Sequence, residues 1–151
     1  MPSAKRILLV EDSEGDIELL FSAVELQQLP CEITIVRDGA EALDFMTQRG
    51  RFAGQSNNPP SLVLLDLKLP KIDGLEVLRR MKGDAVFKRV PIVILTSSRE
   101  ENDLLMSYDL GANAYVVKSM ELSRFLDSIK RLVSFWLFVN EPPPLTRSSA
   151  P

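Results

Sequence analysis

The chain contains no histidine among its 151 residues, so it cannot carry a phosphohistidine. A single cysteine, Cys31, excludes an internal disulfide, and its place in a strand-like segment predicts a packed thiol. No apolar stretch approaches the ~20 residues of a membrane-spanning helix, and the N-terminus lacks the organisation of a signal peptide. A net charge of −3 argues against general affinity for nucleic acid or acidic lipid. These absences together predict a cytoplasmic protein.

What is present is a repeated strand–helix pattern in a chain long enough for one domain. Short apolar runs alternate with longer amphipathic segments, which is typical of a parallel sheet whose crossover connections are helices. The predicted strands are residues 5–10, 32–36, 62–65, 92–95 and 114–117. We therefore expect an α/β fold: a doubly wound five-stranded parallel sheet with helices on both faces, as in flavodoxin-like proteins.

Capping residues predict where the helices begin and end. The expected N-caps are Ser13, Asp38, Asp73 and either Ser97 or Ser98. Asp38 and Asp73 are each followed three positions later by glutamate, the spacing of a capping box. Gly111 is expected to end the fourth helix with a positive φ. Residues 49–60 form a polar loop that is long for a connection within a domain.

The last helix, expected over residues 120–139, has an apolar stripe of 3.6-residue period that predicts packing on the sheet. Its end is apolar on every side, because Phe135, Trp136 and Phe138 lie among further apolar residues. Such a surface is seldom exposed on a monomer, so we expect these three residues to form a homodimer interface. The alternative is that they fold back onto the domain's own surface.

Five chemically active side chains lie at the ends of predicted strands: Glu11, Asp12, Asp66, Thr96 and Lys118. In a parallel sheet the carboxyl ends of the strands share one edge, which is where open α/β folds place their site. We therefore expect these side chains to converge, whereas Asp16 is expected on a solvated helix position and Asp73 as a cap.

Three clustered carboxylates repel one another unless a cation lies between them. One lysine does not balance them, which predicts a Mg²⁺ site at Glu11, Asp12 and Asp66 with the backbone carbonyl of Lys68 as a further ligand. Asp66 could then attack phosphorus and become an acyl phosphate. Lys118 would neutralise the phosphoryl oxygens and Thr96 would hydrogen-bond to them. A purely structural Asp66–Lys118 ion pair is the competing interpretation.

The segments ILLVED (7–12), LVLLDLKLPKIDG (62–74), PIVILTSS (91–98) and GANAYVVK (111–118) resemble the receiver domain of two-component response regulators. The resemblance covers about residues 5–139 and implies a receiver domain at 1–140 followed by a disordered Pro-rich tail at 141–151. It implies that a sensor histidine kinase phosphorylates Asp66, and that the chain is a stand-alone signalling phosphoacceptor rather than an enzyme. It also implies a switch in which Thr96 moves inward and Tyr115 turns into the vacated space, changing the face made by the fourth helix, fifth strand and fifth helix.

One position departs from the family pattern, because Ser119 follows Lys118 where most receivers have a proline after a cis peptide bond. A cis bond without proline costs roughly 3–4 kcal/mol, which favours a trans bond here. This serine, the long loop and the C-terminal FWL segment are similar to the small response regulators paired with cyanobacterial phytochromes. That subgroup implies a light-sensing kinase and a homodimer.

Two other function classes share parts of this pattern. A flavodoxin-type cofactor binder has the same fold, but the first loop, EDSEGD, would repel a phosphate in the absence of a metal. A haloacid dehalogenase-type phosphatase carries a second aspartate two residues after its nucleophile, where this chain has Lys68.

Overall fold

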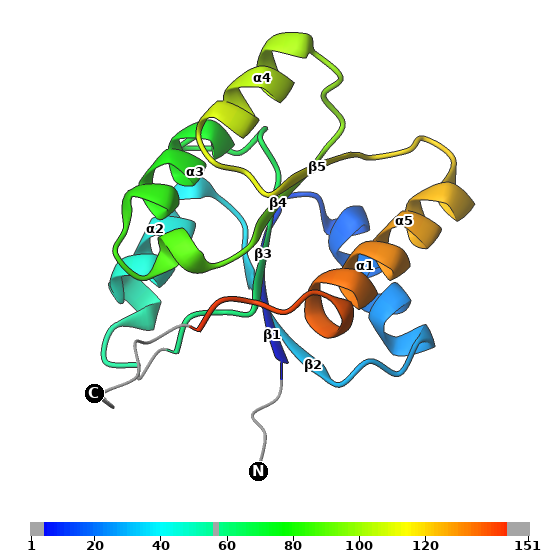
Figure 1. The fold of residues 1–151 in the computed structure, drawn as a ribbon, viewed down its shortest axis with the longest axis horizontal. Coiled ribbons are helices and arrows are strands. Elements are labelled where there is room, and N and C mark those ends of the chain that lie inside the picture. Colours follow the sequence, from blue (N-terminus) through cyan, green and yellow to red (C-terminus); the bar gives the residue numbers. More distant parts are fainter. Residues whose placement is uncertain (1–4, 56–57, 145–151) are drawn as a thin grey trace.

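The computed structural model describes residues 5–55 and 58–144, in which a five-stranded parallel sheet lies between two layers of helices (Figure 1). This confirms the predicted fold class. In chain order the elements are β1 (Lys5–Val10), α1 (Glu14–Leu26), β2 (Cys31–Val36), α2 (Gly39–Thr47), η1 (Gly50–Phe52), β3 (Leu62–Leu65), α3 (Gly74–Gly83), η2 (Phe87–Arg89), β4 (Ile92–Thr96), α4 (Glu101–Asp109), β5 (Ala114–Val117), α5 (Leu122–Ser134) and η3 (Phe135–Val139).

The order of the strands creates a topological switch point beside β1. The sheet runs β2–β1–β3–β4–β5, and every neighbouring pair is parallel. The chain leaves β1 in one direction to form β2 and returns on its other side to form β3. Connections on the two sides of such a switch point diverge, which opens a crevice at the carboxyl ends of β1 and β3.

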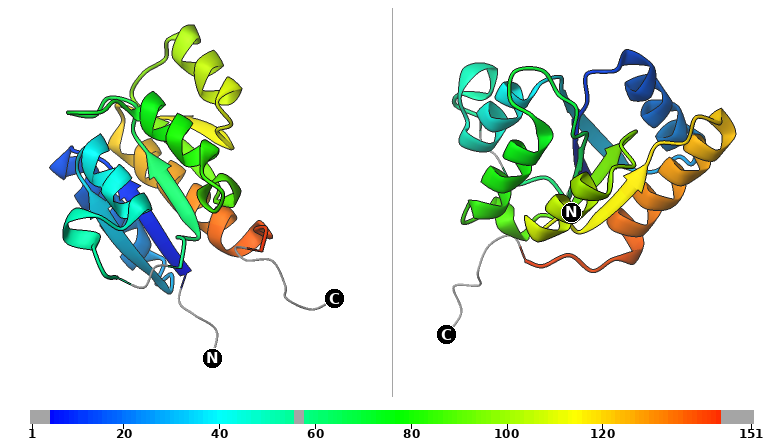
Figure 2. Two further views of the ribbon diagram at one scale, coloured as in Figure 1. Left: turned by 90° about the vertical axis from the view of Figure 1, so that its left-hand side faces the viewer. Right: turned by 90° about the horizontal axis from the view of Figure 1, so that it is seen from above.

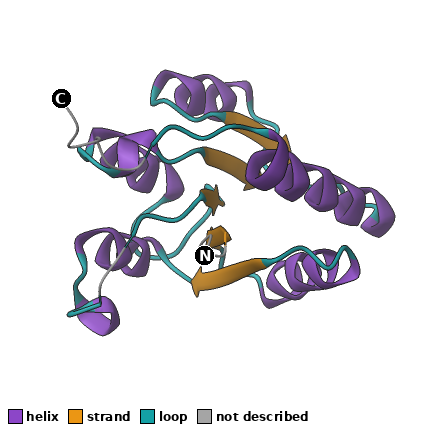
Figure 3. Ribbon diagram, turned by 60° about the horizontal axis from the view of Figure 1, so that its bottom comes forward, coloured by secondary structure: helices purple, strands orange, loops and turns teal. Residues whose placement is uncertain are grey.

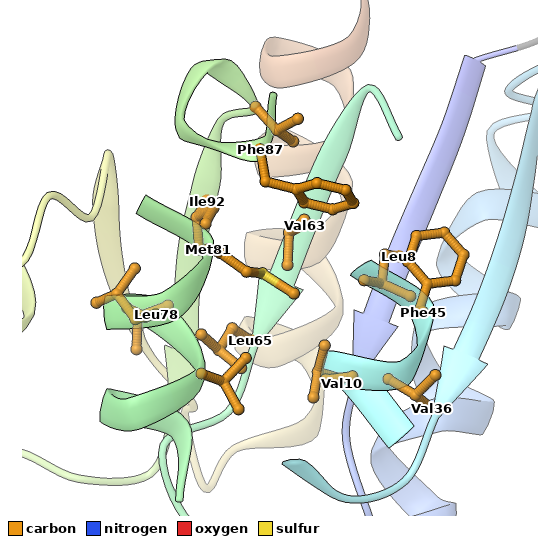
Figure 4. Close-up of a cluster of buried hydrophobic side chains, with 14 of the residues drawn as sticks. Leu8, Val10, Val36, Phe45, Val63, Leu65, Leu78, Met81, Phe87 and Ile92 are labelled. Atoms are coloured by element: carbon orange, nitrogen blue, oxygen red, sulfur yellow. The ribbon is translucent and has the colours of Figure 1, made fainter. Parts of the chain in front are cut away.

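Alternate residues of each strand pack into two separate cores, because successive side chains of a strand point to opposite faces. In β1, Leu8 and Val10 join the core under α2 and α3 (Figure 4). Ile7 and Leu9 join the core under α1 and α5. Figure 3 shows the strands between the two helix layers, and the strands β3 and β4 are buried along their whole length. Their continuous apolar sequences are explained by this burial on both faces.

The predicted helix caps are confirmed at three of the four helices concerned. Ser13, Asp38 and Asp73 each accept a hydrogen bond from the backbone N–H three residues later. The fourth expectation was wrong: the N-cap of α4 is Glu100, whose side chain makes no capping bond to a described residue. The hydroxyl of Ser98 instead accepts from the N–H of Glu100 and donates to Asp103, so it closes the loop ahead of the helix.

The C-terminal helix begins two residues later than predicted and changes its winding at its end. A π-helical turn, η3, follows α5 directly. Leu137 is buried in this turn, and Trp136 packs partly against the core beneath α1 and α5. Phe135 and Phe138 remain 46% and 45% exposed. The end of the helix therefore covers its own domain with one side and presents apolar rings on the other.

The remaining predictions concern loops and termini. The long loop contains the 3₁₀ turn η1, and Gly111 adopts the expected positive φ of 104° after α4. Of the predicted tail, residues 141–144 have no regular secondary structure, and 145–151 lie outside the described residues. None of the described helices combines the length and apolar character needed to cross a membrane.

Candidate functional site at the carboxyl edge of the sheet

The site residues are placed by hydrogen bonds that continue the sheet. The backbone N–H of Glu11 donates to a carbonyl of β2 at 3.0 Å, that of Asp66 to β1 at 3.0 Å, and that of Lys118 to β4 at 2.8 Å. Each side chain thus leaves the backbone at the point where its strand ends. Figure 2 shows, in its view from above, the loops that follow the strands on this edge.

Three carboxylates come together at the carboxyl ends of β1 and β3. One oxygen each of Glu11, Asp12 and Asp66 lies within 4.8 Å of the others. Glu11 and Asp66 are buried, with 2% and 7% exposure, whereas Asp12 is exposed to solvent. Two like charges at 4.8 Å repel by about 3.5 kcal/mol at an effective dielectric constant of about 20. The group therefore needs positive charge close by.

Lys118 supplies part of that charge. Its Nζ lies 2.7 Å from Glu11 Oε2, 3.0 Å from Asp66 Oδ2 and 2.7 Å from Asp16 Oδ2. Burial lowers the pKa of the ammonium, but the hydrogen bonds to Asp16 and Glu11 outweigh burial and leave the pKa above its ordinary value. Lys118 is consequently protonated and positively charged at this edge of the sheet.

The ionised form of the Glu11 carboxyl is disfavoured in spite of its contact with Lys118. Burial raises the pKa of this carboxyl to about 7, although Lys118 and the N–H of Ser13 both favour the ionised form. The charge of Asp66 acts in the same direction as burial. In this environment a second cation would favour the ionised carboxylate.

The donor set fits a hard divalent cation. Carboxylate oxygens are the ligands that Mg²⁺ and Mn²⁺ prefer, and an ion of this kind keeps waters in its remaining positions. The exposed position of Asp12 leaves the group open to solvent on one side. The role of the Lys68 carbonyl stays a prediction, although the N–H of the same residue donates to Asp66 Oδ1 at 3.2 Å.

The predicted switch residues lie on β4 and β5, and Ser98 links them. Thr96 is fully buried, and its Oγ1 accepts a 3.4 Å hydrogen bond from the N–H of Ser98. The hydroxyl of Tyr115 donates to the carbonyl of Ser98 at 3.0 Å. Ser98 therefore bonds to both switch residues. The sequence analysis had considered Ser98 only as a possible helix cap and did not predict this role.

Asp16 is the other residue that the sequence analysis placed wrongly. It was expected at a solvated helix position, yet it is half-buried and pairs with Lys118. The sequence feature that could have predicted this contact is the place of Asp16 in the first turn of α1, three residues after the cap Ser13. Helical side chains lean toward the N-terminus, so this position points back to the strand ends.

The peptide bond between Lys118 and Ser119 is trans, since the described residues contain no cis bond. The serine in place of proline is therefore compatible with an ordinary backbone. Lys118 still reaches both buried acids of the site with this geometry.

Comparisons with known proteins show the family of this chain and match its fold. The family described as "Response regulator receiver domain" matches residues 7–130. The response regulator Rcp1 of Synechocystis sp. is 42% identical over 134 residues, 88% of this chain and 89% of that protein. The crystal structure of the phosphorylated cyanobacterial phytochrome response regulator RcpA has a TM-score of 0.88 and 43% identity, covering 94% of this chain and all of RcpA. The Mn²⁺-bound form of Rcp1 has a TM-score of 0.87 and 40% identity, covering 93% and 99%.

Proposed function

This chain belongs to the response regulator receiver domain family, and we propose that it accepts a phosphoryl group on Asp66 from a sensor histidine kinase in a Mg²⁺-dependent reaction. One observation carries the proposal: the Asp66 carboxylate lies 3.0 Å from the Lys118 ammonium and also belongs to the three-acid group that fits a divalent cation. The receiver domain would comprise residues 1–140, with 141–151 as a tail.

Each residue has a role that follows from its position. Asp66 is the nucleophile, and its burial limits the access of water to the carboxylate. Lys118 donates to a phosphoryl oxygen and neutralises part of the negative charge that the transferred group carries. Thr96 offers its hydroxyl from the neighbouring strand. A divalent cation bound by Glu11, Asp12 and Asp66 supplies charge neutralisation for the transferred group.

The phosphodonor that we propose is a kinase of the phytochrome class. Support comes from the relatives, since RcpA is described as a phytochrome response regulator and aligns with 94% of this chain. The absence of histidine in the chain is consistent with a donor that resides on another protein.

We further propose that phosphorylation switches the face made by α4, β5 and α5. A phosphoryl group on Asp66 would draw the Thr96 hydroxyl away from the N–H of Ser98. Since Ser98 also accepts from Tyr115 and donates to Asp103 on α4, a shift of the loop would release the tyrosine and move the start of the helix. A packed core responds to such a local change between discrete arrangements.

Intact-mass measurement after incubation with acetyl phosphate and Mg²⁺ tests the acceptor. The wild type should gain the mass of one phosphoryl group, and Asp66→Asn should gain none, because an amide oxygen is a far weaker nucleophile than a carboxylate. Asp109→Asn, at the exposed end of α4, is the matched control and should gain one group. Equal uptake by Asp66→Asn and the wild type would show that the acceptor lies elsewhere. Removing divalent cations with a chelator should suppress uptake by the wild type.

The two alternative functions have less support. The acidic crevice lacks the phosphate-cradling loop of a flavodoxin-type cofactor site, and Lys68 stands where a haloacid dehalogenase-type phosphatase needs its acid. A flavodoxin-type cofactor site does not account for the contact of Lys118 with Glu11 and Asp66.

We also propose that η3 forms a homodimer interface made by the exposed rings of Phe135 and Phe138 together with the partly buried Trp136. Phe135 packs edge-on against Trp136 with ring centroids 5.2 Å apart, while Phe138 and Val139 are 45% and 70% exposed. Apolar side chains that share one turn form a continuous patch that favours association.

Replacing Phe138 by glutamate should convert the dimer to a monomer in sedimentation velocity, because a charge would be buried without a partner in the interface. Val86→Glu is a suitable control, since Val86 is 42% exposed and lies between α3 and η2, away from α5. An unchanged sedimentation coefficient for Phe138→Glu, at a concentration where the wild type is dimeric, would refute this interface.

A further inference from the structure

The ammonium of Lys118 is saturated by carboxylates. It has three N–H donors, and Glu11, Asp16 and Asp66 each place one oxygen within 3.0 Å of Nζ. The residue is 11% exposed, so water has little access to these donors. Any new acceptor at this site must therefore replace one of the three carboxylates.

Asp16 differs from the other two acids. Glu11 and Asp66 belong to the group that fits a divalent cation, and Asp16 does not. Asp16 comes from the first turn of α1, where its N–H donates to the cap Ser13 at 3.3 Å. The backbone of Asp16 is thus held in the first helical turn, and its carboxylate lies outside the three-acid group.

We propose that Asp16 is a positioning residue that holds the Lys118 ammonium on the phosphoacceptor while Asp66 is converted to an acyl phosphate. This inference rests on the proposed function. With acetyl phosphate as donor, an Asp66 oxygen forms a bond to phosphorus, the bond from phosphorus to the acetyl oxygen breaks, and acetate leaves with the electron pair. No proton is transferred.

The conversion removes the negative charge of the Asp66 carboxylate, which departs with the acetate, and brings in the phosphoryl group with its own negatively charged oxygens. The N–H that pointed to Asp66 then finds its acceptor on the phosphoryl group. A divalent cation held by Glu11 would share the charge of this carboxylate and weaken its attraction for the lysine. Of the three carboxylates that contact Lys118, only that of Asp16 neither reacts nor belongs to the three-acid group. Asp16 therefore keeps Nζ in place while the contacts with Glu11 and Asp66 change.

Asp16→Asn should lower the rate of phosphorylation by acetyl phosphate on the order of tenfold, less than the hundredfold cost of a 1 Å misplacement of a reacting group. Glu18→Gln makes the same change of charge on an exposed position of α1, and its rate should stay within about twofold of the wild type, as for exposed charges that solvent screens. Both rates are measured by intact mass at saturating Mg²⁺.

A double-mutant cycle shows whether Asp16 acts through Lys118. In the Lys118→Met background, Asp16→Asn should cause no further loss of rate. The same four proteins, unfolded with urea without divalent cations, provide a second readout independent of phosphorylation. Asp16→Asn should shift the unfolding midpoint in the presence of Lys118 and leave it unchanged in the Lys118→Met background.

The outcomes separate this inference from the function on which it rests. A wild type that takes up no phosphate contradicts the proposed function. A phosphorylated wild type with an equally fast Asp16→Asn overturns the role of Asp16 alone. Additive effects of Asp16→Asn and Lys118→Met on the unfolding midpoint would also contradict the role of Asp16. This readout remains available if the double mutant is phosphorylated too slowly to measure.

Discussion

Gly74→Ala should destabilise the protein by about 3 kcal/mol, the upper range for overpacking of a close-packed site, and should slow phosphorylation of Asp66. A Cβ at Gly74 would lie 2.3 Å from the carbonyl oxygen of Asp66 and 2.5 Å from Cα of Leu67. Both atoms belong to the backbone, so no side-chain rotation relieves the overlap. The loop that carries the phosphoacceptor would have to move away from α3. Urea unfolding and the acetyl phosphate assay measure the two effects.

The other end of the same helix offers a matched control. A Cβ at Gly83, the last residue of α3, would meet nothing within 4 Å. Gly83→Ala should therefore be neutral or stabilising by up to about 1 kcal/mol, the difference between the two residues in helix propensity. If both alanine variants unfold at the same urea concentration, the tight contact between α3 and the loop of Asp66 is not part of the folded protein in solution.

The free energy of unfolding should fall by about 3 kcal/mol between pH 4.5 and pH 8 through Glu11 alone. Burial raises the pKa of this carboxyl from 4.5 to about 7 in the folded protein. A group whose pKa is raised by folding binds more protons when folded, so its contribution is complete below pH 4.5 and is lost as the pH rises through 7. A difference of 2.5 pH units corresponds to about 3 kcal/mol at 1.36 kcal/mol per unit. Urea unfolding at several pH values measures this loss.

Glu11→Gln isolates this contribution, because an amide has no proton to lose in this range. Relative to the wild type, the variant should gain about 3 kcal/mol between pH 4.5 and pH 8. Glu18→Gln, on the exposed side of α1, should follow the wild-type curve. Parallel curves for Glu11→Gln and the wild type would contradict the assigned pKa. Added Mg²⁺ should flatten the wild-type profile, because a cation binds the ionised carboxylate.

Much of the fold could be predicted because the signals are local. A strand buried on both faces needs a continuous apolar run, and the predicted bounds of β3, which is fully buried, coincide with those observed. Ser13, Asp38 and Asp73 cap helices because a side-chain oxygen next to the first turn satisfies a free N–H. The cap of α4 was missed because the hydroxyl of Ser98 bonds to Asp103 and to its own loop instead.

The candidate site was predictable for a topological reason. Parallel strands bring their carboxyl ends to one edge, so the residues that follow them must be neighbours whatever the separation along the chain. This is sufficient to bring Glu11, Asp66 and Lys118 together, across a separation of 107 residues between Glu11 and Lys118. The roles of these residues in phosphotransfer stay a prediction.

The amino-acid sequence by itself determined which residues form strands, where most helices begin and which acids share an edge, since periodicity and capping act over a few residues. Only the tertiary structure decided that Asp16 is the third carboxylate in contact with the Lys118 ammonium. It also decided that burial raises the pKa of Glu11 to about 7, and that the backbone next to α3 leaves no room for a side chain at Gly74. These features depend on distances between elements far apart in the chain, and desolvation and steric overlap change over about an ångström, a scale that residue patterns do not specify.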